Sequence, residues 1–354
     1  MTMQESDHEI PIDYGGSIGW PLKPSACPTT TYVLGSLENA IEISRALPWY
    51  WFRGHDRVFG ELTPSVFRRH TVPRAWMPDH FTYAERNAYN QFRRKAPAHL
   101  DRPMLPNDAV SWLMLMQHHG CPTRLLDWSE SLLVALFFAV RDRHRHNEDA
   151  ELWAMFPPML NELSAAERGL PPPHSPHLAF LAEEAWGDQS RLQRLSIAIR
   201  QTWCAKQGFW HEKPPGPIAF EPQLAFPRLV AQRGVFTIHP NPYVHVPRWE
   251  QKADGVVQSK GVRIGDRPPT IVDLLTDPRA LVRYIVPAQS KPGISGDFAT
   301  LGYSERTLFM SLDGLGAEVR QEIGGGSDEY KPRVPPLAGG PWPTRFHPHG
   351  WPGI

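Results

Sequence analysis

The chain has 354 residues, of which 41% are hydrophobic, and its 37 basic side chains balance 37 acidic ones. This composition supplies a hydrophobic core and excludes wholesale disorder. A net charge of zero excludes a protein that coats nucleic acid by bulk electrostatic attraction. The three cysteines, Cys27, Cys121 and Cys204, are too far apart in the sequence to suggest a zinc knuckle or a disulfide framework.

Targeting and membrane signals are weak. The N-terminal segment MTMQESDHEIPIDYGG is acidic and has no apolar centre, so we expect no signal peptide. The longest apolar run, Leu132 to Val140, is far shorter than the ~20 residues that cross a bilayer. We therefore expect a cytoplasmic protein with no membrane segment.

Helical patterns dominate the first half of the chain. Residues 36–47 predict a helix with Ser36 as its N-cap, and an aromatic strand is expected directly after it at 49–52. Further helices are predicted at 83–95, 107–119 (capped by Asn107 or Asp108 and stopped by Gly120) and 130–143. The last contains LLVALFFAV, which is apolar on every side, so we expect it to be the buried central helix.

Strand patterns follow in the second half, at residues 149–156, 228–239 and 283–287, with helices predicted at 191–204 and 312–323. Gly234 suggests a bulge or a close backbone approach. Helices first and strands later, without regular alternation, indicate an α+β fold rather than a doubly wound sheet. The glycine patterns of dinucleotide-binding and P-loop folds are absent.

The first candidate site residue is Arg53, which follows the aromatic strand and precedes Gly54. A guanidinium there can project into a cleft, and its planar fork suits phosphate or carboxylate. Gly54 would let a ligand approach the backbone. The alternative is an arginine paired with an internal carboxylate.

A second polar segment, residues 117–129, leads directly into the apolar helix. We expect Thr123, Arg124 and Asp127 to form a polar cluster at the wall of the cleft, because half-buried polar groups need partners. Asp127 followed by Glu130 also fits a capping box, so a structural role at the start of the helix stays open.

Five motifs carry a resemblance to a known family: Phe52-Arg53-Gly54, HGCPTRLLDW (119–128), ALFFA (135–139), AQRGVFT (231–237) and TLFMSLDG (307–314). Together they resemble the FRG domain family over roughly residues 30–323. We accordingly expect an N-terminal extension at 1–30, the domain at 31–323 with an insertion at 157–217, and a Pro/Gly-rich tail at 324–354.

The same motifs resemble, in modified form, the ADP-ribosyltransferases. That superfamily has an arginine or histidine on a first strand, a strand that leads into an Ala-x-x-Phe-Ala-like helix, and a glutamate that opens a later strand. Where the glutamate is expected, this chain has Gln232 or Gly234. The resemblance implies a single α+β domain with short strands, a buried central helix and peripheral helices.

The resemblance also implies roles for individual residues, with NAD⁺ as substrate and no metal. Arg53, Gln232 and Asp127 are the expected catalytic residues. The expected NAD⁺-binding residues are Arg53, at the pyrophosphate, with Gly54, Thr123, Arg124 and Trp128, whose ring would stack on nicotinamide. Gln232 can hold a ribose hydroxyl but carries no charge, so Asp127 or Glu221 would have to stabilise the developing cation.

The histidines do not form a metal-binding pattern. The pair His118–His119 is adjacent on a predicted helix, and His144 and His146 lie in a solvated turn, so neither pair shares one metal easily. No metal site is therefore expected.

We expect an NAD-dependent ADP-ribosyltransferase or NAD hydrolase that acts as a toxin or phage-defence effector. Its acceptor would be a protein, a nucleic acid or water, and an antitoxin or regulatory partner would control it. The alternative is a non-catalytic ligand-binding or regulatory module on the same scaffold. A carboxylate within hydrogen-bond reach of Gln232 would favour the enzyme, and its absence would favour the module.

Overall fold

The computed structural model describes residues 31–310 except for 69–76, 101–104, 166–168, 173–174, 187–190, 192–193, 196–215, 224–225, 242–247, 252–256 and 261–269. The predicted helix at 312–323, the extension at 1–30 and the tail at 324–354 lie outside these residues, as does most of the predicted helix at 191–204. The fold contains both helices and a mixed β-sheet, which agrees with the predicted α+β class.

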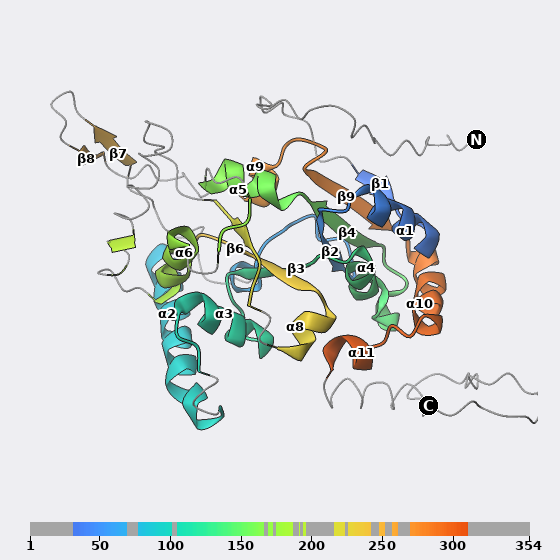
Figure 1. Ribbon diagram of the computed structural model, residues 1–354, viewed down its shortest axis with the longest axis horizontal. Coiled ribbons are helices and arrows are strands. Elements are labelled where there is room, and N and C mark those ends of the chain that lie inside the picture. The colour runs from blue at the N-terminus through green and yellow to red at the C-terminus, as the bar shows by residue number, and fades with distance from the viewer. Residues whose placement is uncertain are drawn as a thin grey trace, which may run out of the picture.

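Seven strands form one mixed sheet in the order β1-β9-β4-β2-β3-β6-β5 (Figure 1). Strand β1 runs parallel to β9, and the other neighbours are antiparallel. The strands are β1 (Thr31–Val33), β2 (Trp51–His55), β3 (Leu125–Ser129), β4 (Ala150–Met155), β5 (Ile218–Phe220), β6 (Gly234–Ile238) and β9 (Leu281–Val286). A separate hairpin consists of β7 (Arg248–Gln251) and β8 (Val257–Lys260).

The helices among the described residues surround this sheet. They are α1 (Leu37–Ala46), α2 (Met77–Lys95), α3 (Ala109–His118), α4 (Leu132–Val140), α5 (Pro157–Ala165), α6 (Pro176–Trp186), α8 (Pro227–Ala231), α9 (Ile271–Leu274), α10 (Lys291–Thr300) and α11 (Glu305–Phe309), with short 3-10 turns at 65–67, 96–98, 143–145 and 288–290.

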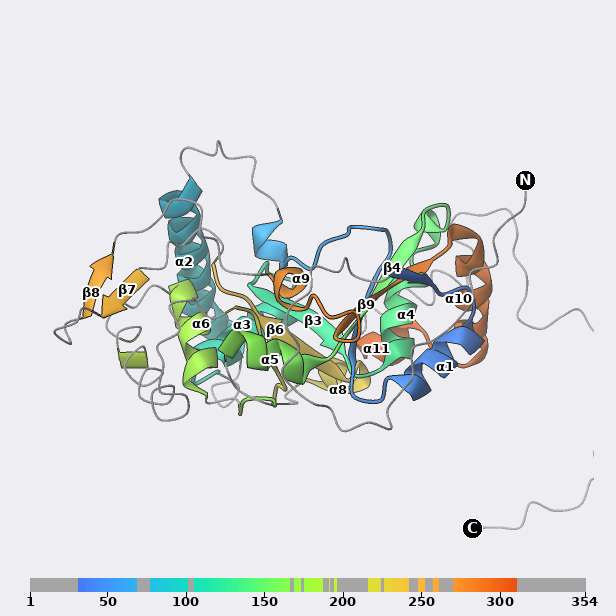
Figure 2. The ribbon, with the colours of Figure 1, turned by 90° about the horizontal axis from the view of Figure 1, so that it is seen from above.

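The sheet opens between its two central strands. Strand β2 pairs with β4 along its whole length, but with β3 only through Phe52 and Ser129. Two groups of elements result, and both views separate them (Figures 1 and 2). Helices α1, α4 and α10 lie with β1, β9, β4 and β2, whereas α2, α3 and α6 lie with β3, β6 and β5. This opening positions the candidate site.

Each group has its own hydrophobic core, and a third core spans both on the opposite face of the sheet. In the first, α4 buries Leu132 and Leu136 against β2 and β4. In the second, α3 and α6 bury Leu113 and Leu181. Each fully buried leucine contributes about 1.5–3 kcal/mol. The predicted central position of the apolar helix is confirmed, because α4 also packs against α1 and α10.

The predicted helix ends are largely confirmed. The Ser36 side chain accepts a hydrogen bond from the Asn39 amide at the start of α1, and Asp108 accepts one from Ser111 at the start of α3. Gly120 has φ of +75°, the left-handed conformation that often follows a helix. Helix α2 begins earlier than predicted, at Met77 instead of residue 83.

Two boundaries differ from the prediction. Asp127 does not cap the apolar helix, because it lies in the middle of β3 and Ser131 provides the cap at 3.4 Å from the Val134 amide. The strand forms because Leu125 to Ser129 pair in full with β6. The segment 228–239 is not one strand either. Pro227, favourable in the first turn of a helix, begins α8, and β6 starts only at Gly234.

Gly54, which is predicted to let a ligand approach the backbone, lies where the backbone of α4 approaches β2. A Cβ atom at this position would lie 1.8 Å from the carbonyl oxygen of Ala135 and 3.1 Å from the Ala139 nitrogen. The missing side chain therefore allows the backbone of α4 to approach β2. Gly234 is also a position of close approach, as predicted, since its Cβ would lie 2.4 Å from Leu229 Cδ1.

Candidate functional site

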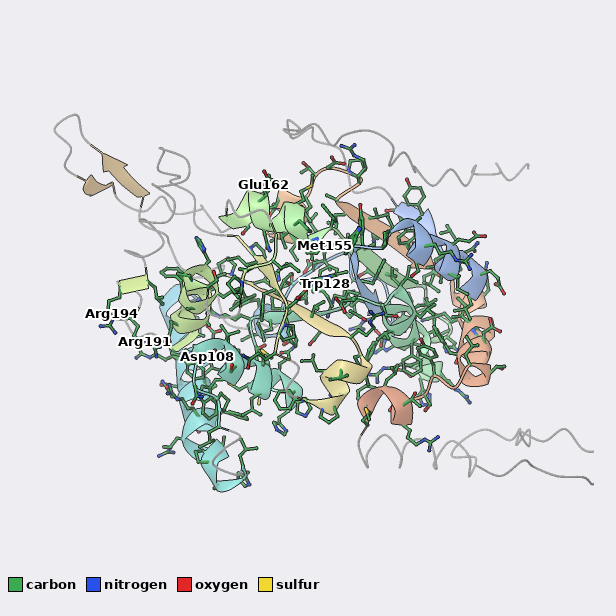
Figure 3. The ribbon with its side chains drawn as sticks, in the orientation of Figure 1. Asp108, Trp128, Met155, Glu162, Arg191 and Arg194 are labelled. Atoms are coloured by element: carbon green, nitrogen blue, oxygen red, sulfur yellow. The ribbon has the colours of Figure 1, made fainter. Side chains whose placement is uncertain are left out.

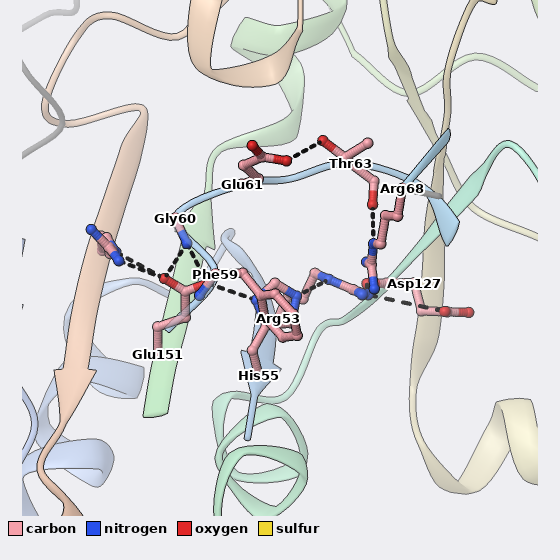
Figure 4. A network of polar contacts seen from close by, with 10 residues as sticks. Arg53, His55, Phe59, Gly60, Glu61, Thr63, Arg68, Asp127 and Glu151 are labelled. Atoms are coloured by element: carbon pink, nitrogen blue, oxygen red, sulfur yellow. Dashed lines mark hydrogen bonds and ion pairs between the residues drawn. The ribbon is translucent and has the colours of Figure 1, made fainter. Parts of the chain in front are cut away.

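Arg53 lies on β2 and reaches across the opening to β3 (Figure 4). Its Nε donates a hydrogen bond of 2.8 Å to His55 Nε2, and its Nη1 donates one of 2.5 Å to the carbonyl oxygen of Asp127. Nη1 is also 4.0 Å from the Asp127 carboxylate. The weak pairing of β2 with β3 makes this possible, because a complete ladder would bond the Asp127 carbonyl to the neighbouring backbone instead.

The charge of Arg53 is only partly compensated. Its side chain is 14% exposed, and Nη2 has no hydrogen bond or ion pair in the part of the chain that the structure describes. Desolvation lowers the pKa of Arg53 to about 10, although Asp127 and Glu151 oppose this. An anionic ligand that bonded Nη2 would stabilise the buried charge.

Asp127 presents an exposed carboxylate beside this guanidinium. Its side chain is 58% exposed. Gln117 Nε2 donates to Asp127 Oδ2 at 2.8 Å, and Thr123 Oγ1 donates to Gln117 Oε1. This short chain fixes the orientation of the Asp127 carboxylate. Of the expected cluster of Thr123, Arg124 and Asp127, the structure thus joins Thr123 and Asp127 through Gln117, and Asp127 lies beside Arg53.

Two further arginines lie within the electrostatic reach of Asp127. Desolvation lowers the pKa of Arg68 and of Arg228, and the Asp127 carboxylate opposes this in both. Arg68 Nε donates to the carbonyl of Thr63, and Arg228 lies over the ring of Phe309. Three guanidinium groups, including Arg53, thus interact electrostatically with one exposed carboxylate.

Arg124 lies in the interior and not at the site. It is 0% exposed, and its guanidinium bonds both oxygens of Glu85 on α2, at 3.1 and 2.7 Å, as well as Glu184 and the carbonyl of Leu181. Desolvation opposes its charge, but Glu85 and Glu184 outweigh this and raise the pKa of Arg124. The guanidinium of Arg124, which the resemblance assigns to NAD⁺, is therefore bonded inside the protein in this structure.

Trp128 is also internal, at the centre of the molecule in Figure 3. Its ring is 3% exposed, and Nε1 donates to Thr237 Oγ1 at 3.1 Å. Thr237 in turn contacts His239 Nε2 at 2.9 Å. Trp128, which the resemblance assigns to nicotinamide, is therefore a core residue in this structure.

Gln232 ends α8 and does not open a strand. Its Nε2 donates to the carbonyl of Leu308 on α11 at 3.1 Å, and its own carbonyl accepts from Ser129 Oγ at 2.8 Å. Among the hydrogen bonds and ion pairs of the described residues, none joins a carboxylate to the Gln232 side chain. Gln232 therefore ties α8 to α11.

This arrangement predicts the effects of two substitutions. Gln232→Ala removes the bond to Leu308, and Gln232→Glu places an anionic oxygen beside that carbonyl. Both are expected to lower the free energy of unfolding by about 1 kcal/mol. Urea denaturation of both variants checks this. Wild-type stability in both variants would show that the bond to Leu308 does not hold α8 to α11.

Two buried histidines predict a pH dependence of stability. Desolvation, then Arg53, lower the pKa of His55 to about 4 and that of His239 to about 3. Below pH 6.5 the unfolded chain binds protons at these rings and the folded chain does not. Stability therefore falls as the pH falls, by about 2 kcal/mol between pH 7 and 5.5. Urea denaturation across this range tests the slope. His144→Gln, at an exposed position, should not change it, and a flat wild-type profile would contradict it.

Several residues of the network are absent from the sequence-based prediction. His55, Glu151, Arg68 and Gln117 surround Arg53 and Asp127 but come from separate elements. A signal existed for His55 alone, because residues 53 and 55 share one face of a strand. The others are brought close only by the sheet and by the segment that follows β2.

The comparison with protein families finds one similarity. Residues 49–148 match the model of the FRG domain. This segment includes Arg53, Gln117, Asp127 and all of α4. No curated protein and no solved structure matches the chain.

The described residues include no group of three or more His, Cys, Asp or Glu side chains arranged to hold a metal ion. In the same part of the chain, no helix combines the length and the apolar character that crossing a membrane requires.

Proposed function

We propose that the chain binds NAD⁺ through Arg53 and cleaves the bond between nicotinamide and ribose, as an ADP-ribosyltransferase or an NAD hydrolase. One observation carries the proposal: Nη1 of Arg53 lies 4.0 Å from the exposed carboxylate of Asp127, while no hydrogen bond among the described residues occupies Nη2. The guanidinium can bind a phosphate, and the carboxylate can stabilise a cation. NAD⁺ contains phosphate groups and forms a cationic ribose during cleavage.

Each side chain would have a defined task. The fork of Arg53 binds the pyrophosphate, which suits its planar geometry. As nicotinamide leaves with the electron pair of the glycosidic bond, positive charge develops on the ribose. The carboxylate of Asp127, oriented by Gln117, stabilises that charge. Water or a nucleophile of the acceptor then forms the new bond to the ribose carbon and loses its proton.

The arrangement of elements also supports an ADP-ribosyltransferase-like fold. The arginine lies on one central strand, the neighbouring strand β3 leads into the buried helix α4, and the sheet opens between the two strands. A role as a toxin or defence effector, with an antitoxin or regulatory partner, rests on the family resemblance and is part of this proposal.

A second candidate is a module that binds the ligand without cleaving it. Two observations favour it. The Gln232 side chain bonds the Leu308 carbonyl, so the position at which a transferase would carry its glutamate is used for packing, and no hydrogen bond or ion pair of the described residues joins a carboxylate to Gln232. The two candidates share the site at Arg53 and differ only in the role of Asp127.

Consumption of NAD⁺ by purified protein distinguishes them. Wild type is expected to release nicotinamide, and Asp127→Asn to release it roughly 10²–10³ times more slowly while still binding NAD⁺. Asp142→Asn, at the half-buried cap of a short helical turn, is the matched control and should match wild type. Binding without turnover in wild type selects the module. Full turnover in Asp127→Asn would remove Asp127 from the mechanism, and wild type that neither binds nor consumes NAD⁺ would refute the proposal.

A further inference from the structure

Arg53 is hydrogen-bonded to His55, which contacts Glu151, and the proposed mechanism uses neither residue. Arginine Nε is only a donor, so His55 Nε2, at 2.8 Å, must be the acceptor. The proton of the neutral imidazole is then on Nδ1, which lies 2.8 Å from Glu151 Oε1. The hydrogen-bond directions therefore fix one tautomer of His55.

Glu151 is in turn fully bonded and fully buried. Its carboxylate accepts from the amides of Phe59, at 3.0 Å, and Gly60, at 3.2 Å, and from Arg283 at 2.9 Å. Desolvation opposes its charge, but the bonds from His55 and the Phe59 amide outweigh it and lower the pKa of Glu151 to about 2. Glu151 thus has no free position for a substrate, and it stays ionised.

The chain Glu151–His55–Arg53 runs across the sheet from β4 to β2 and ends at the carbonyl of Asp127 (Figure 4). These hydrogen bonds use Nε and one hydrogen of Nη1, so the guanidinium cannot rotate without breaking two bonds. The N–H groups of Nη2 therefore point in a fixed direction. A guanidinium whose orientation is already fixed loses less conformational entropy when it binds a phosphate.

We infer that Glu151 and His55 are positioning residues that orient Arg53 for its anionic ligand, an inference that rests on the proposed function for the ligand's identity. Glu151 selects the Nδ1–H tautomer of His55. In the other tautomer, Nε2–H would face Arg53 Nε–H, and the two donors would repel each other.

Nitrogen-15 spectra of the ligand-free protein at pH 7 test the inference without any ligand. Wild type is expected to show His55 neutral and protonated on Nδ1, with a slowly exchanging Arg53 Nε–H. The isosteric Glu151→Gln is expected to lose this single tautomer, since an amide can also donate to Nδ1. A charged or Nε2-protonated His55 in wild type would overturn the inference even if Glu151→Gln does not fold.

An affinity cycle then tests whether the pair acts through Arg53. Glu151→Gln is expected to weaken NAD⁺ binding on the order of tenfold. In an Arg53→Gln background the same change should have no further effect, whereas an equal loss in both backgrounds would indicate a general structural role and overturn the inference. Wild type with the expected spectrum but no NAD⁺ binding would refute the proposed function and leave the orientation of Arg53 established.

Discussion

Replacement of Gly54 by alanine is expected to lower the free energy of unfolding by about 3 kcal/mol or more, or to prevent folding. The new Cβ would lie 1.8 Å from the carbonyl oxygen of Ala135. No rotamer change relieves this contact, because the clashing atom belongs to the backbone of α4. The helix would have to move away from β2 and open the first core.

Gly296→Ala is the matched control. Gly296 lies inside α10, and apart from its chain neighbours and the backbone of its own helix, a Cβ there has no heavy atom within 4 Å. Alanine at this position should leave stability unchanged or raise it by up to ~1 kcal/mol, as helix propensity requires. Urea denaturation compares the two. If the Gly54→Ala variant had the same free energy of unfolding as wild type, α4 would not approach β2 as closely as described.

Arg124→Gln is expected to lower the free energy of unfolding by about 3–5 kcal/mol, because it removes one partner from a buried ion pair. It would leave the carboxylates of Glu85 and Glu184 in the interior with no cation between them. The variant should unfold at a much lower urea concentration, and any variant that stays folded should bind NAD⁺ with unchanged affinity.

Arg279→Gln provides the comparison on the surface. The Arg279 side chain is 64% exposed and pairs with Asp277, so its removal should cost less than ~1 kcal/mol. If Arg124→Gln were as stable as Arg279→Gln and bound NAD⁺ poorly, Arg124 would belong to the site after all.

The sequence predicts the helices better than the site. The cap at Ser36 and the apolar run of α4 are local patterns, and both appear as expected. The segment around Gln232 is misassigned because an apolar run of this length fits a strand or a short helix equally well. Pro227 was the local signal that favoured the helix.

The three residues of the first motif illustrate why side-chain roles are harder to predict. Phe52 and Gly54 face α4, one as part of the core and one as the point of closest approach, while Arg53 points to the other side of the sheet. The period of a strand predicts this alternation. It does not predict which face carries a helix, so the sequence alone does not place Gly54 against α4.

Arg124 and Asp127 show the same limit. Both are polar residues in one short segment, yet one is completely buried and the other is 58% exposed. Their difference depends on Glu85 and Glu184, which lie on α2 and α6. Only the tertiary structure brings those carboxylates to Arg124 and leaves Asp127 beside Arg53.

Calorimetric titration of NAD⁺ into wild type, Arg53→Lys and Arg279→Lys tests the central claim most directly. Lysine keeps the charge of Arg53 but cannot bond His55, Asp127 and a phosphate together in one plane. The account predicts that wild type and Arg279→Lys bind NAD⁺ equally well, and that Arg53→Lys binds at least about tenfold more weakly. Equal affinity in all three proteins would contradict the assignment of Arg53 as the ligand-binding residue.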